Sequence, residues 1–165
     1  MALKFLYTLF IGLLLAAFVG IGIATFYVAP KSPDYPRALS EPKIGPTGVS
    51  SLTPEEQVAQ QKQQAEYDQQ QKTYQTQANT YERNVSVLAI LAAILILILA
   101  LTLARHILVI ADGLLLGGIL TLFYAIIRGF SSDDLKFRFI VVTIGLGVTL
   151  LLGYLKFVKP DETKK

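Results

Sequence analysis

The chain has 165 residues, of which 53% are apolar and only 16% are charged, and its formal net charge is +3. Soluble domains carry about 25% charged residues, so this chain has too few charges to cover a water-facing surface. The absence of cysteine excludes disulfide scaffolds, Cys-ligated zinc, iron–sulfur clusters and thiol catalysis. The single histidine, His106, excludes multi-histidine metal sites and most catalytic triads. The composition therefore predicts a membrane protein without cofactor or metal and removes most enzyme classes.

Four long apolar runs account for the apolar excess. A helix needs about 20 apolar residues to cross a lipid bilayer, and these runs lack the alternation of barrel strands. The sequence therefore predicts an all-α integral membrane protein whose four transmembrane helices form a compact bundle. The first run is too long for the apolar region of a cleaved signal peptide, which favours a retained signal anchor. The spans are expected at residues 1–28, 85–104, 107–127 and 139–158.

Residues 29–53 form a linker rich in proline and glycine. Pro30, Pro33 and Pro36 recur every third residue, which fits the three-residue turn of polyproline II. The segment is therefore expected to be extended or irregular. An alternative is that the segment binds a partner that recognises proline-rich sequences. However, prolines with this spacing are also common in linkers.

Residues 54–84 are predicted to form a helical arm that continues into the second span. Thr53, Pro54 and Glu56 have the spacing of a capping box with proline in the first helical position. The sequence that follows is rich in glutamine and contains no glycine or proline before Gly113. These features predict one helix over Pro54–Ala104, with about half of it outside the membrane.

The arm also carries a heptad pattern that suggests a coiled coil. Tyr67, Tyr74 and Tyr81 are seven residues apart, and a second row three residues earlier contains glutamine and then alanine. Heptad rows of this kind form the seam between packed helices, although leucine and isoleucine would be more typical. We take the three tyrosines as candidate contacts with a partner. The alternatives are a solvated helix with a tyrosine stripe and a partly disordered segment.

Small residues at every fourth position mark candidate packing seams in the spans. Association of helices in a bilayer depends on close packing, which small residues permit. We therefore expect a compact bundle in which the spans at 107–127 and 139–158 form the closest pair. The seam residues are Gly12, Ala16 and Gly20 in the first span, Gly113, Gly117 and Thr121 in the third, and Gly145, Thr149 and Gly153 in the fourth.

Asp112 is the one ionisable residue well inside an apolar run. An intramembrane carboxylate suggests a transport role. However, Asp112 lies near the start of its run, and Asp-Gly is good helix-capping chemistry. We therefore favour a structural role in which the helix begins at Asp112 and the carboxylate pairs with Arg105 or His106. A similar spacing, Ser131 to Asp134, predicts that the last helix begins near Ser132.

The distribution of Lys and Arg indicates which segments face the cytoplasm. Cations are densest near the two termini and in the short turn at 105–106, which favours cytoplasmic termini and a basic cytoplasmic tail at 159–165. Residues 29–84 and 128–138 would then be extracytoplasmic, in the plasma membrane. Membrane lipids are expected partners. The scattered positive charges do not indicate nucleic-acid binding.

These features favour a non-enzymatic membrane protein that acts by association, either as an accessory or scaffold subunit or by self-assembly. The arm and the small-residue seams would provide the contacts. The alternative is a small transporter or channel component with a polar path around Asp112. That alternative requires Thr121, Thr143 and Thr149 to face a wet cavity together with Asp112.

Overall fold

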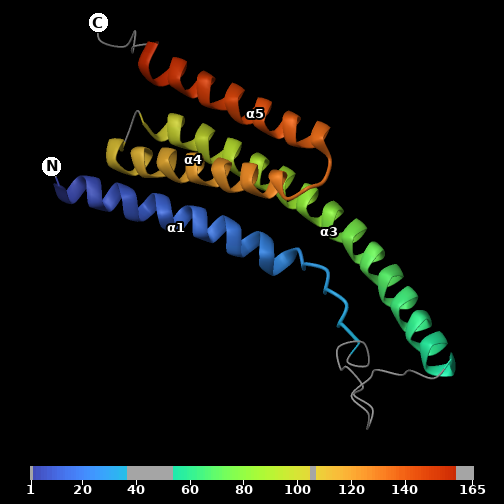
Figure 1. The fold of residues 1–165 in the computed structure, drawn as a ribbon. Helices are drawn as coiled ribbons and strands as arrows, with labels where there is room; N and C mark the ends of the chain where they lie inside the picture. Colours follow the sequence, from blue (N-terminus) through green and yellow to red (C-terminus); the bar gives the residue numbers. More distant parts are fainter. Residues whose placement is uncertain (1, 37–53, 105–106, 159–165) are drawn as a thin grey trace, which may run out of the picture. The chain divides into compact units, whose positions relative to one another are not determined.

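A computed structural model describes residues 2–36, 54–104 and 107–158 (Figure 1). All four α-helices in these ranges are long and apolar enough to cross a membrane, and the described residues contain no strand. The prediction of an all-α fold with four such helices is confirmed. The helices are α1 (Ala2–Phe26), α3 (Pro54–Leu103), α4 (Leu108–Phe130) and α5 (Leu135–Gly153), and a π-helical turn, Tyr154–Val158, follows α5.

The chain divides into two compact units. One unit is the helical bundle, made of Met1–Val28 and Asn79–Lys165, and the other is Ala29–Ala78. Within the bundle, consecutive helices run in opposite directions (Figure 1). The start of α1, the start of α4 and the end of α5 therefore lie at one end of the bundle, which we call the Lys156 end. The opposite end, where α1 finishes and α4 meets α5, is the Arg128 end.

Helix α3 belongs to both units and is continuous from Pro54 to Leu103, 50 residues. It begins with Pro54 in the first position, and Glu55 and Glu56 lie in the first turn, where acidic side chains favour the helix dipole. The predicted cap residue, Thr53, lies outside the described residues, as do linker residues 37–53 and tail residues 159–165. The predicted long helix is confirmed, and we call its part in the second unit, Pro54–Ala78, the arm.

Glycines let α1 and α4 pack closely against each other. A Cβ atom placed on Gly117 would lie 2.8 Å from Leu15 Cδ2 and 3.2 Å from the Gly12 carbonyl oxygen. A Cβ atom on Gly12 would lie 2.9 Å from the side chain of Leu116. The glycines of the two helices therefore let the backbones come together, and larger side chains from the facing helix fill the space.

The other glycines of α4 face the remaining helices. A Cβ atom on Gly118 would lie 2.5 Å from Leu97 of α3, and one on Gly129 would lie 2.9 Å from Val141 of α5. Buried Ala89 and Ala93 of α3 complete a core with Leu122 and Ala125 of α4 and Val141 of α5. Helix α4 therefore packs on each of the other three helices through small residues.

The predicted closest pair was wrong. In α5, Gly145 packs against Ile126 of α4, but nothing lies within 4 Å of a Cβ atom placed on Gly153. Thr149 is exposed. The small residues of α5 therefore meet α4 at Gly145 and diverge from it towards the Lys156 end. In α1, Ala16 is half-buried between Gly12 and Gly20, so this seam does face α4.

Two helix starts also differ from the predictions. Helix α5 begins at Leu135 rather than near Ser132, because the Asp134 side chain caps it by accepting hydrogen bonds from the backbone N–H groups of Lys136 and Phe137. Helix α4 begins at Leu108, so Asp112 lies inside the helix and does not cap it. The Asp112 side chain pairs instead with Lys156, as described below.

Gly117 offers a direct test of the α1–α4 contact. We expect Gly117→Val to destabilise the bundle, because added methyl groups in a packed contact cost about 1–3 kcal/mol. Thermal unfolding in detergent is the measurement. The matched control is Gly147→Val in α5, where nothing lies within 4 Å of an added Cβ atom. Equal unfolding temperatures for the two variants would contradict the packing described here.

Candidate functional site

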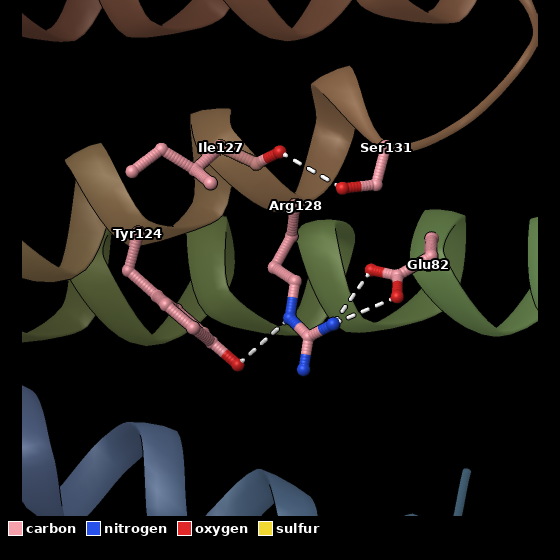
Figure 2. Close-up of polar contacts among 5 residues, drawn as sticks. All are labelled: Glu82, Tyr124, Ile127, Arg128 and Ser131. Carbon is pink, nitrogen blue, oxygen red and sulfur yellow. Dashed lines mark hydrogen bonds and ion pairs between the residues drawn. The ribbon is translucent and has the colours of Figure 1, made fainter.

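At the Arg128 end of the bundle, an ion pair joins α3 to α4 (Figure 2). Arg128 Nη1 donates to both carboxylate oxygens of Glu82, at 2.7 and 2.9 Å. Arg128 Nε donates to the Tyr124 hydroxyl at 3.2 Å. The side chains of Arg128 and Glu82 are 29% and 19% exposed, so water screens this pair less than it would a surface pair. The contact fixes α3 relative to α4 at this end.

Aromatic rings surround the guanidinium group. Its carbon lies 5.9 Å from the ring centroid of Tyr81 and 5.7 Å from that of Tyr124, within the range of cation–π attraction. Tyr81 in turn stacks on Tyr27, with centroids 5.2 Å apart and planes 5° from parallel. We call Arg128, Glu82, Tyr124, Tyr81 and Tyr27 the Arg128 cluster. It connects the chain just after α1 with α3 and α4.

Further polar contacts connect the same end of the bundle to the loop between α4 and α5. Asn79 Nδ2 donates to Asp133 at 2.7 Å, and the Asp133 backbone N–H donates to Asn79 Oδ1 at 2.9 Å. Arg138 Nε donates to the Ser132 carbonyl oxygen at 2.6 Å. Because each contact links different elements, the Arg128 end is held by a network rather than by one ion pair.

The chemistry of this network is that of a structural junction. Its carboxylates are paired with a guanidinium or amide group, and it contains no cysteine or histidine. Among the described residues, no group of three or more His, Cys, Asp or Glu side chains is placed to hold a metal ion. The hydroxyl of Ser131, shown in Figure 2, donates to the Ile127 carbonyl oxygen of its own helix. The arrangement can hold helices at a fixed register.

At the Lys156 end, Asp112 pairs with Lys156. The Lys156 Nζ atom lies 2.6 Å from Asp112 Oδ1, and the two side chains are 32% and 40% exposed. The predicted partners, Arg105 and His106, lie outside the described residues. The pair joins the first turns of α4 to the π-helical turn after α5, so Asp112 does contribute to helix contacts, as a link to the end of the chain rather than as a cap.

The second unit contains a cleft between the arm and the segment that follows α1. The cleft has a volume of about 500 Å³. The ring of Tyr67 on the arm meets the ring of Tyr35 edge to face, with centroids 5.1 Å apart. Tyr74, the next tyrosine of the heptad row, lines the cleft. The lining residues are Lys31, Pro33, Glu66, Gln69, Gln70, Thr73, Tyr74 and Gln77.

The three candidate contact tyrosines therefore have different surroundings. Tyr67 and Tyr74 face the extended segment of the second unit, whereas Tyr81 is 8% exposed and belongs to the Arg128 cluster. Sequence reasoning did not identify Glu82 and Arg128 as a pair. The sequence did contain an indication of this pair. Glu82 lies just before the second expected span and Arg128 just after the third, so both side chains are expected at the same membrane surface.

No family model, curated protein or solved structure matches the chain.

A double-mutant cycle tests the junction. We expect Glu82→Gln and Arg128→Gln each to destabilise the bundle by about 1–2 kcal/mol, since each leaves a partly buried charge without its partner. The double variant should lose less than the sum, because the second change removes no remaining ion pair. Unfolding in detergent gives the three free energies. Strict additivity would show that the two side chains do not interact in the folded bundle.

Proposed function

We propose that this protein is a non-enzymatic integral membrane protein that acts by association. It would serve as an accessory or scaffold subunit of a membrane complex or assemble with itself, and the arm would provide the contact. The observation that carries the proposal is the cleft beside the arm. Exposed side chains that donate and accept hydrogen bonds converge there, including Lys31, Glu66 and Gln70. The groups of the Arg128 cluster, in contrast, are occupied with one another.

The polar groups of the spans favour association over transport. The hydroxyls of Thr121, Thr143 and Thr149 each donate to the carbonyl oxygen four residues earlier in the same helix, at 2.8 Å. Each bond uses the hydroxyl proton within its own helix, so these three side chains do not donate across a shared polar path. Asp112 is paired with Lys156 near one end of α4. A transporter or channel with a path around Asp112 is therefore the weaker candidate.

The proposed topology has both termini in the cytoplasm and residues 29–84 and 128–138 outside the plasma membrane. The density of Lys and Arg near the termini and at 105–106 supports this orientation. The aromatic residues at the Arg128 end suit either interface, because tyrosine is enriched on both sides of a bilayer.

Cysteine labelling tests the orientation, because the natural chain has no cysteine. A Ser50→Cys variant in intact cells should react with a membrane-impermeant maleimide, since residue 50 would face the exterior. A cysteine added after Lys165 serves as the control and should react only in permeabilised cells. The reverse pattern would invert the topology.

Purification in mild detergent tests association. We expect the protein to elute as a complex heavier than one chain and its detergent, with either further copies or a second protein. Replacing Tyr67 and Tyr74 together by alanine should shift the complex towards the single chain, because these rings lie on the proposed contact face. Replacing exposed Lys72 and Gln75 by alanine is the matched control. A wild-type chain that is monomeric and without partner would contradict the proposal.

A further inference from the structure

A groove with apolar walls opens at the Lys156 end of the bundle, where α1 and α4 both begin (Figure 1). Its volume is about 600 Å³, within the range of sites that hold small organic ligands. Helix α1 supplies most of the lining, with side chains three and four residues apart that share one side of the helix. The lining residues are Leu3, Lys4, Leu6, Tyr7 and Phe10 of α1 and Val109 of α4.

Lys4 is the one charged residue in this lining. Among the described residues, no carboxylate forms an ion pair with it. Lys156, at the same end of the bundle, is already paired with Asp112 at 2.6 Å. Lys4 lies in the first turn of α1, at the end of a helix that is long and apolar enough to cross a membrane. The groove therefore has a cation at the membrane surface and apolar walls below it.

The groove is short compared with a membrane span. Its outermost and innermost residues on α1, Leu3 and Phe10, are seven residues apart, about 10 Å along the helix axis. The hydrocarbon core of a bilayer is about 30 Å thick. A transmembrane helix of a partner packs through contacts repeated along its length, whereas a lipid has its charge at the surface and its acyl chains directly below. The depth and charge of the groove match a lipid of the same leaflet better than a helix.

We propose that this groove binds one anionic phospholipid, with the phosphate against Lys4 Nζ and an acyl chain along Leu6 and Phe10. In the proposed topology the Lys156 end faces the cytoplasm, and anionic lipids of the cytoplasmic leaflet attract basic residues close to the surface. A zwitterionic phospholipid offers the same acyl chain, but its ammonium group offsets the attraction between its phosphate and Lys4. The groove shares no residue with the arm, so lipid binding there does not depend on the proposed association.

Photocrosslinking with two lipids tests the site. The full chain is reconstituted in phosphatidylcholine vesicles that contain a small fraction of a probe lipid with a photoreactive group in its acyl chain. The probe is a phosphatidylglycerol in one sample and a phosphatidylcholine with the same chains in the other. Mass spectrometry of peptides identifies the labelled residues. We expect the phosphatidylglycerol probe to label residues 3–10 about fivefold more, the preference that one lysine near the membrane surface produces.

Leu150 of α5 is the control position in the same chain. It is exposed and lies six residues before Lys156, just as Phe10 is exposed and lies six residues after Lys4. Lys156 already has a carboxylate partner, so it should attract an anionic headgroup less than Lys4 does. The two probes should therefore label Leu150 equally.

Two variants identify the role of Lys4. Lys4→Gln should bring the two probes to equal labelling of residues 3–10, and Lys4→Arg should keep the preference. Equal labelling in the natural chain, or a preference that survives Lys4→Gln, would overturn the proposal. The same preference at Leu150 would also overturn it, because the charge of the whole surface would then be responsible. Failure of both probes to label residues 3–10 would do so as well, and would show that protein rather than lipid covers the groove.

Discussion

Close packing at the glycines of α4 is the constraint on which the rest of the bundle depends. In lipid, apolar side chains gain little by leaving the solvent, so helices associate where their backbones can approach. Gly117 meets Gly12 of α1, Gly118 meets Leu97 of α3, and Gly129 meets Val141 of α5. Because these glycines lie on different faces, one helix can hold three neighbours. The register set there brings Arg128 beside Glu82.

Charged groups in the bundle pair where the spans end. Glu82 and Arg128 form an ion pair at one end, and Asp112 and Lys156 form one at the other. Between them, the buried hydroxyl of Ser86 donates to the Ala125 carbonyl oxygen of α4, so this polar group also serves helix contact. A buried polar group without a partner would be costly in lipid. These polar groups of the bundle thus serve internal contacts between helices.

The helices follow from the sequence because their signals are local: uninterrupted apolar runs, and a stretch without proline or glycine from Glu55 to Asp112. Of the heptad tyrosines, Tyr67 contacts Tyr35 and Tyr74 lines a cleft with Lys31 and Pro33, while the coiled coil itself stays a prediction. The sequence did not predict which row of small residues packs against which helix. Gly113 packs against Ile11 of α1 and Gly145 against Ile126 of α4, but both are simply glycines in an apolar span until the helices are placed. The Asp134 cap and the pairing of Asp112 with Lys156 likewise depend on the conformation of neighbouring segments.

Helix α3 is a single helix of 50 residues, and we propose that it runs from an aqueous arm into the bilayer. Single cysteines at each position from 54 to 103, reacted with a charged maleimide in membranes, test it directly. We predict reaction up to about residue 84 and none beyond until the Lys156 end. Within the arm, reaction should be slower at the half-buried positions, which are Gln60, Gln64, Tyr67, Gln71, Tyr74 and Ala78. Uniform reaction along residues 54–84, or protection that begins far from Val85, would contradict it.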